Sequence, residues 1–156
     1  MNKILFFVAL CISFLNADFL QPNSFITRLN DFKYVTPNDT VVKIPKDVKL
    51  VIVSSEKATG ALVNEYLDTQ NADYLQKNRA VFIADINKMP SLVTKMLALP
   101  KLRKYKHPIY INYDERFEEI VPNKEERVTL LYVENSIIKN ISYISTKEEL
   151  KKAIEK

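Results

Sequence analysis

The chain contains very few of the residue types on which cofactor and metal sites depend. Its 156 residues include one glycine, one cysteine, one histidine and no tryptophan. Gly60 alone cannot form a phosphate-binding loop or a dinucleotide fingerprint, because both motifs need several glycines at fixed spacing. His107 alone, without a second histidine or cysteine near it, is a poor basis for a zinc or copper site. We therefore expect no cofactor and no bound metal.

The only cysteine, Cys11, lies in an apolar N-terminal run. Lys3 precedes this run, which covers residues 4–15 and is followed shortly by Ala17. A positive end, a short apolar core and a small residue are the parts of a secretory signal peptide, whereas a membrane span needs about 20 apolar residues. We expect residues 1–17 to be a signal peptide cleaved after Ala17, so that the mature protein is periplasmic or secreted. An uncleaved membrane anchor is the alternative.

Strong charge of one sign is also lacking. The formal net charge of +4 does not single out nucleic acid as a partner. Cations gather in one short run, which consists of Lys101, Arg103, Lys104 and Lys106. This run is expected either to complement the dipole at a helix C-terminus, to attract the acidic residues that follow Asp114, or to dock to an acidic partner or, weakly, to an anionic membrane surface. The acidic residues between positions 114 and 119 fit no EF-hand loop, which favours a solvated acidic face.

Apolar runs separated by turn residues predict a sheet with helical crossovers. The expected strands are residues 32–35, 41–44, 50–53, 80–84, 108–113, 128–133 and 137–144. The first two flank Pro37, Asn38 and Asp39, which predict a hairpin turn. The third run is wholly apolar and rich in β-branched residues, as in a strand that is buried on both faces.

Two helices are expected between these strands. The first carries apolar residues at helical spacing, namely Leu62, Val63, Tyr66 and Leu67. After Pro90 the same spacing returns in Leu92, Val93, Met96 and Leu97. Pro100 is expected to end or kink this second helix and to leave residues 101–105 as a turn, because proline lacks the backbone donor that a helix interior needs.

The C-terminal part predicts a hairpin followed by a helix. In its second strand, alternation places Ile138, Asn140, Ser142 and Ile144 on one face and the intervening residues on the other. Thr146 and Glu149 have the spacing of a capping box, which predicts a helix over residues 147–155. We find no repeat and no linker, and expect one domain over residues 31–156 after a lead-in at 18–30 that includes a short helix near residues 24–30.

This order of elements resembles the thioredoxin-like superfamily, in particular its peroxiredoxin and exported thiol-disulfide branch. The resemblance rests on the segments Asp31–Ile44, Val48–Val53, Arg127–Ile141 and Thr146–Leu150. It implies an α/β, three-layer fold with an N-terminal β-hairpin, a βαβ crossover, and a C-terminal β-hairpin plus helix. The segment Met89–Tyr105 also resembles an uncharacterised family of small exported bacterial proteins, some of which are labelled flavin dehydrogenases.

The reactive cysteines of that superfamily are missing. The resemblance places them in the loop after the central strand, which here reads Ser54, Ser55, Glu56, Lys57, Ala58, Thr59 and Gly60. The cis-proline expected before the closing hairpin is replaced by Arg127, which we expect to be solvated and to balance Glu125 or Glu126. Without a low-pKa thiolate, thiol-disulfide exchange and peroxide reduction are excluded.

Two classes of function remain. The first is an exported binding or accessory protein without redox activity, which acts through an envelope protein partner. The second is an enzyme of another class on the same scaffold, such as a flavin-dependent oxidoreductase. A nucleophilic hydroxyl of Ser54, Ser55 or Thr59 with His107 as base is a third interpretation. Helix capping explains the same hydroxyls without a catalytic role, so we prefer it.

Overall fold

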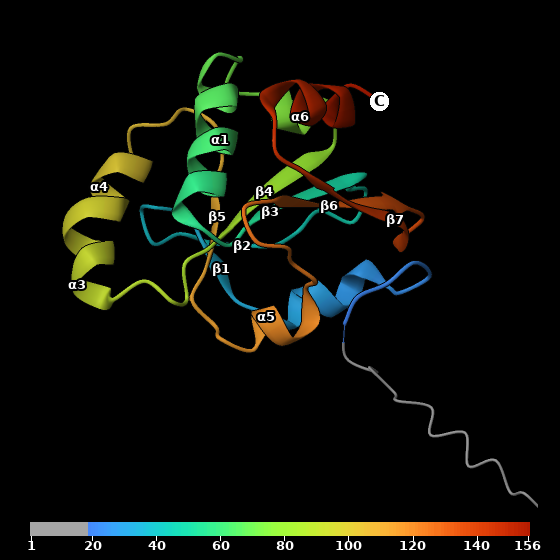
Figure 1. Cartoon of the computed structure of the whole chain (residues 1–156), viewed down its shortest axis with the longest axis horizontal. Coiled ribbons are helices and arrows are strands. Elements are labelled where there is room, and N and C mark those ends of the chain that lie inside the picture. Colours follow the sequence, from blue (N-terminus) through green and yellow to red (C-terminus); the bar gives the residue numbers. More distant parts are fainter. Residues whose placement is uncertain (1–18) are drawn as a thin grey trace, which may run out of the picture.

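Seven strands pair into one mixed sheet in the computed structural model, which describes residues 19–156 (Figure 1). Their order is β2-β1-β5-β4-β3-β6-β7. β3, β4 and β5 run parallel, and every other neighbouring pair is antiparallel. The strands are β1 (Tyr34–Val35), β2 (Val41–Val42), β3 (Leu50–Ser54), β4 (Ala80–Asp85), β5 (Tyr110–Asn112), β6 (Val128–Glu134) and β7 (Ile137–Ile144). The expected signal peptide, residues 1–17, lies outside the described residues.

The expected βαβ crossover is confirmed at the centre of the sheet. β3 is buried along its whole length, as its apolar and β-branched residues predict. Helix α1 (Lys57–Asp68) leads from β3 to β4, and these two strands pair in parallel from Leu50 opposite Ala80 to Ser54 opposite Ala84. The end of β3 and the start of α1 are therefore placed where the superfamily carries its thiols.

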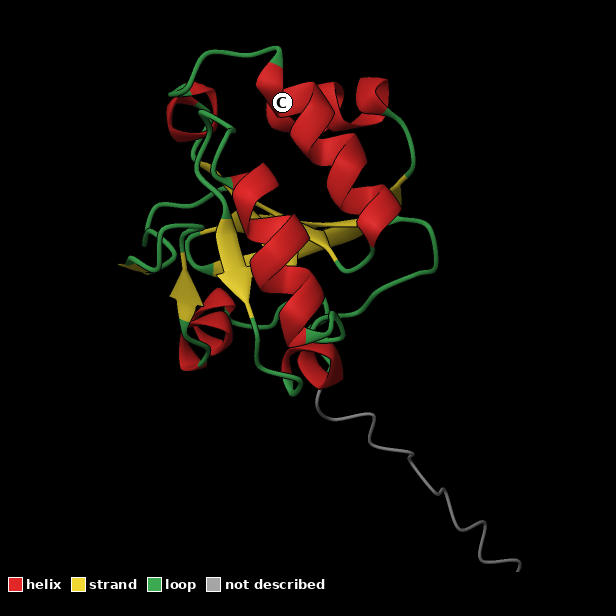
Figure 2. Ribbon diagram, turned by 90° about the vertical axis from the view of Figure 1, so that its left-hand side faces the viewer, coloured by secondary structure: helices red, strands yellow, loops and turns green. Residues whose placement is uncertain are grey.

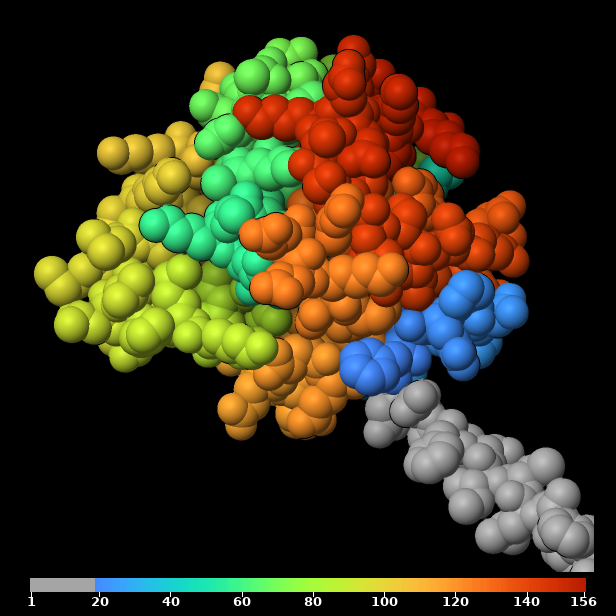
Figure 3. Space-filling model, in the orientation of Figure 1, coloured from blue at the N-terminus to red at the C-terminus, as the bar shows by residue number. Residues whose placement is uncertain are grey.

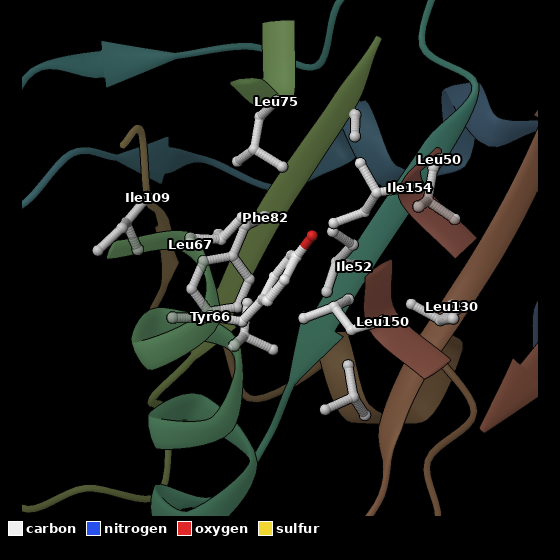
Figure 4. Packing of buried hydrophobic residues seen from close by; sticks show 14 of the residues in the cluster. Leu50, Ile52, Tyr66, Leu67, Leu75, Phe82, Ile109, Leu130, Leu150 and Ile154 are labelled. Carbon is white, nitrogen blue, oxygen red and sulfur yellow. The ribbon is translucent and has the colours of Figure 1, made fainter. Parts of the chain in front are cut away.

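Helices cover both faces of the sheet, so the domain has three layers (Figure 1). One face is covered by α1, α2 (Tyr74–Lys77) and α6 (Lys147–Ile154), and the other by the 3-10 helix η1 (Ile26–Asp31) and by α5 (Phe117–Ile120). Figure 4 shows the first of the two cores, in which side chains of α1 and α6 meet those of β3 and β4. The predicted three-layer arrangement is thus present.

The segment before residue 31 belongs to the second core. Leu20, Ile26 and Leu29 are buried there, and the short helix expected near residues 24–30 is η1. The hydroxyl of Tyr34 in β1 donates a hydrogen bond of 2.7 Å to the carbonyl of Leu29. The chain is therefore packed against the sheet from Leu20 onward.

Both predicted hairpins and the predicted capping box are confirmed. Tyr34 and Val35 pair with Val42 and Val41 in the N-terminal hairpin, which is shorter than the sequence indicates. β6 and β7 form the C-terminal hairpin. At the start of α6, the Glu149 N–H donates to Thr146 Oγ1 at 3.2 Å, and the Thr146 N–H donates to Glu149 Oε2 at 3.1 Å.

The simple alternation predicted for β7 is wrong at its beginning. Tyr132 pairs with Asn140 but Val133 pairs with Ile138, so Lys139 is an extra residue in a β-bulge. Because the bulge shifts the alternation by one residue, Ile138 and Ile144 lie in different cores.

Among residues 19–156, no helix has the length and apolar character that crossing a membrane requires.

Candidate functional site

The first candidate region is the junction of β3 and α1, where the superfamily would carry its thiols. Ser54 is the last residue of β3, Ser55 and Glu56 connect the strand to the helix, and residues 57–60 form the first turn of α1. Ser54 and Thr59 are buried, whereas Ser55 is half-buried. The region thus has the expected place in the fold and lacks the expected chemistry.

Hydrogen bonds of Glu56 and Thr59 cap the start of α1. The N-cap residue is Glu56 and not a serine, which corrects part of the capping interpretation. Thr59 Oγ1 accepts from the Glu56 N–H at 3.2 Å and donates to the Glu56 carbonyl at 3.0 Å. Glu56 Oε1 accepts from the backbone N–H of Glu126 at 3.0 Å. Gly60 lies inside the first turn of α1 at a negative φ, so it belongs to the helix and not to the loop in which the resemblance places it.

The structure pairs His107 with a helix residue and not with a hydroxyl. His107 is 5% exposed, and its Nε2 lies 2.8 Å from Oδ1 of Asn64, whose Nδ2 donates to the Gly60 carbonyl at 2.9 Å. Nδ1 of His107 is buried and has no hydrogen-bond partner among the described residues. Burial lowers the pKa of His107 to about 4. The ring is therefore a neutral, structural group at neutral pH, and no contact supports the nucleophile interpretation.

The second candidate region is the helical segment 91–102, which leads from β4 towards β5. It consists of α3 (Ser91–Val93), the π-helical turn η2 (Thr94–Ala98) and α4 (Leu99–Leu102). The Leu99 N–H bonds to the carbonyl of Thr94, five residues earlier, and this wider turn accommodates Pro100 within the helix. The sequence predicts that Pro100 ends or kinks the helix and leaves residues 101–105 as a turn; the helix does not end there but continues to Leu102, and the turn covers only residues 103–104. A local change of helix type takes the place of a break.

The four apolar residues whose spacing predicts this helix all face outward, whereas Leu99 of the same segment is buried. Figure 2, in which this side faces the viewer, shows the helix lying in front of the sheet with no other element over it, and Figure 3 shows it at the left edge of the surface. We call the following four exposed residues the apolar helix face. They are Leu92 at 67% exposure, Val93 at 40%, Met96 at 67% and Leu97 at 69%.

The predicted basic run adjoins this face. Lys101 lies in the last turn of α4, Arg103 is its C-cap, and Lys104 and Lys106 follow; all four are exposed. This location confirms that the run marks a helix C-terminus. None of the four forms an ion pair within residues 19–156; instead Glu118 pairs with Lys88 and Asp114 with Arg116. The expected attraction to the acidic segment after Asp114 is therefore not seen.

A buried polar cluster at the carboxyl ends of β4 and β5 was missed by the sequence analysis. Asn112 Nδ2 donates to Asp85 Oδ1 at 2.9 Å, and Asn87 Nδ2 donates to both Asp85 carboxylate oxygens at 2.9 and 3.0 Å. Burial raises the pKa of Asp85, although these hydrogen bonds oppose the shift. Both strands end in the same register, with Asp85 opposite Asn112. Only a correct parallel pairing of β4 and β5 would have brought these residues together.

Arg127 is exposed, as expected, but its hydrogen-bond partner differs from the expected one. Arg127 Nη1 donates to Ser145 Oγ at 2.9 Å, and no ion pair links it to Glu125 or Glu126. The acidic segment after Asp114 contains the one-turn helix α5. Within residues 19–156, no group of three or more metal-binding side chains is placed to hold an ion.

Comparisons with known proteins find structural similarity only. No family model matches the chain, and no curated protein matches it. An uncharacterised thioredoxin-like protein from Porphyromonas gingivalis is 14% identical at a TM-score of 0.48, over 80% of this chain and 87% of that one. A peroxiredoxin-like protein from Aquifex aeolicus is 6% identical at a TM-score of 0.49, over 88% of this chain and 85% of that one. A thioredoxin-like protein from Aeropyrum pernix is 14% identical at a TM-score of 0.46, over 83% of this chain and 91% of that one.

The fold is thioredoxin-like. This statement rests on the order of elements described above: the N-terminal hairpin, the parallel crossover, the C-terminal hairpin and the last helix. Cysteine is absent from residues 19–156, since the only one in the chain is Cys11. The described domain therefore has a thioredoxin-like fold without a thiol.

Proposed function

We propose that the protein is an exported, non-redox, thioredoxin-like binding or accessory protein that acts through a protein partner in the periplasm or outside the cell. The observation that carries this proposal is the apolar helix face, a contiguous group of large apolar side chains on one exposed helix. Such groups mark interaction sites, because leaving them in water gains nothing for the folded monomer. The thiol-free helix start supports the non-redox part of the proposal, and the signal peptide expected at residues 1–17 supports export.

The charges near this face define the partner. Lys95 lies within η2 and Lys101 within α4, and Lys104 follows two residues after the helix. These lysines are exposed and form no ion pair within residues 19–156. A complementary surface has an apolar patch with carboxylates at its rim, because such a surface matches both the apolar centre and the cationic edge.

A protein fits this face better than a membrane surface does. Helices that bind in the membrane interface usually combine Trp, Phe and Leu on one face with many cations on the opposite, solvated face. Here no aromatic residue belongs to the apolar helix face, and the opposite side of the helix contributes Thr94 and Leu99 to the buried interior. Met96 supplies a flexible side chain of the kind common at adaptable protein-binding surfaces.

The test starts from the tagged full-length protein, which is used to capture candidate partners from an envelope extract. Each candidate is then purified, and its Kd is measured with the wild-type protein and with a triple variant, Leu92→Ser, Met96→Ser and Leu97→Ser. A matched control is Val41→Ser, since Val41 is also an exposed apolar residue, on β2. We expect the triple variant to weaken binding at least about tenfold, which corresponds to about 1.4 kcal/mol, and the control to leave it unchanged.

Three outcomes would contradict the proposal. Equal affinity of the triple variant and the wild type would remove the apolar helix face from the interface. Binding to vesicles that contain phosphatidylglycerol, lost in the triple variant, would assign the face to a membrane surface instead. A yellow purified protein, or one that takes up FMN or FAD on mixing, would support the flavin-dependent enzyme and overturn a pure binding role.

A further inference from the structure

A cavity lies on the other side of the same helical segment. Its volume is about 710 Å³, within the range of typical small-ligand sites. Ile86, Met89 and Leu99 supply apolar lining, and Arg103 and Asp39 supply charges of opposite sign. The cavity is thus bounded by the loop after β4, by the helix and by the turn between β1 and β2.

Arg103 is held in place at this cavity. Its Nε donates a hydrogen bond of 2.9 Å to the carbonyl of Pro37 in the turn between β1 and β2. No acceptor within residues 19–156 binds its two Nη atoms. A guanidinium that is fixed through Nε and free at Nη suits a carboxylate, which accepts two parallel hydrogen bonds from such a fork.

Asp39 supplies the opposite charge without neutralising Arg103. Asp39 adopts a positive φ of 62° in the turn, and no ion pair joins its carboxylate to Arg103 or to any other described residue. Both charged residues line the same cavity, together with Tyr113. The cavity therefore presents an anion and a cation that are not paired with each other.

We infer that this cavity binds a short apolar peptide with free termini, whose carboxylate contacts Arg103, whose ammonium group contacts Asp39 and whose side chains cover Met89 and Leu99. A zwitterionic ligand uses both unpaired charges, whereas a simple anion would leave Asp39 facing it. Lys95, which also lines the cavity, adds a second cation on the helix and favours the carboxylate. This site lies on the inner side of the helix, away from the apolar helix face, and shares only Lys95 with the partner surface proposed above.

The test uses the mature protein and the dipeptide leucyl-phenylalanine in three forms: free, N-acetylated and C-amidated. We expect the free dipeptide to bind in the millimolar range or tighter by isothermal titration calorimetry. Each blocked form should bind about tenfold more weakly, because each loses one charge-assisted contact.

Variants assign each contact to a residue. Arg103→Ala should weaken binding of the free and N-acetylated forms while leaving the C-amidated form unaffected. Asp39→Asn, which tolerates the same positive φ, should weaken the free and C-amidated forms alone. Lys104→Ala is the matched control, since Lys104 belongs to the basic run but does not line the cavity. Melting temperatures verify that each variant is folded.

Two results would overturn the inference. One is the absence of any binding of the free dipeptide to the wild-type protein in the millimolar range. The other is binding that does not distinguish the blocked forms or that persists unchanged in both charge variants. The triple variant of the apolar helix face should bind the dipeptide as the wild type does, so failure of the partner proposal and failure of this one are distinguishable.

Discussion

Two helices of this protein have the same spacing of apolar residues, but one buries these residues and the other exposes them. In α1, Val63, Tyr66 and Leu67 are buried and Leu62 packs against the same core, whereas in segment 91–102 the equivalent residues form the apolar helix face. α1 crosses the middle of the sheet beside α6, where apolar side chains enter a closed core. Segment 91–102 lies beyond α1 at the side of the domain (Figure 1), and its inward side consists of other residues, among them Thr94 and Leu99. Spacing alone therefore indicates an amphipathic helix but not what covers its apolar side.

The largest expected difference comes from the same substitution in each helix. Leu67→Ala should destabilise the protein by about 2–5 kcal/mol, because Leu67 is 1% exposed and its loss leaves a cavity. Leu97→Ala should change stability by less than about 0.5 kcal/mol, because Leu97 is 69% exposed. Urea unfolding of both variants measures the difference. Similar losses in both would mean that the apolar helix face is buried in solution, for example by a second copy of the chain.

His107, which pairs with Asn64 of α1, is expected to make the free energy of unfolding depend on pH by about 3 kcal/mol. The pKa of His107 falls from its usual 6.5 to about 4 in the folded protein, so the unfolded chain takes up this proton at higher pH than the folded one. Stability from His107 is therefore fully present above pH 6.5 and is lost as the pH falls towards 4.

Comparing wild type with His107→Gln isolates this contribution. Urea unfolding between pH 4 and 7 should give a steeper loss of stability in the wild type. Parallel curves for the two proteins would show that His107 is accessible to water or already protonated, contrary to its buried position beside Asn64.

A smaller contrast is expected at the first turns of the two helices. Thr59→Val removes the hydroxyl that accepts from the Glu56 N–H, and should cost about 1 kcal/mol. Thr94→Val should be nearly neutral, because the Pro90 carbonyl to which Thr94 Oγ1 donates also accepts the Thr94 N–H. Thermal unfolding of the pair measures this contrast. A larger loss of stability in Thr94→Val than in Thr59→Val would contradict the capping role of the Thr59 hydroxyl.

No effect at all is expected from reducing agents. A chain that begins at Asp18 contains no thiol, so it should neither reduce insulin nor consume peroxide above the buffer rate. Its melting temperature should be the same with and without dithiothreitol. Activity in this form would contradict the assignment of a non-redox helix start.

Much of the architecture could be predicted because it depends on local patterns. The buried run of β3, the turn at Pro37 and the capping box of Thr146 each specify one element, and their order indicates the thioredoxin-like fold. The structure differs from the prediction where the pattern of apolar residues gives no signal. The bulge at Lys139 is one, and the π-helical turn that accommodates Pro100 is another.

The candidate site was harder to predict because its contacts join distant residues. His107 and Asn64 are 43 residues apart, and Arg103 and Pro37 are 66 apart. The cations from Lys101 to Lys106 were identified from the sequence, since a charged run is visible without the fold. That Arg103 borders a cavity, and that the neighbouring apolar residues face outward, follows only from how the helix lies on the domain.

The most direct test of the binding role places a photocrosslinking residue at Met96, within the apolar helix face, or at Val41 as the exposed control. Irradiation of cells that produce the full-length protein at its native level should yield one discrete crosslinked protein from position 96 and none from position 41. That product should disappear when Leu92 and Leu97 are changed to serine. The absence of a product at position 96, or the same product from both positions, would contradict the account.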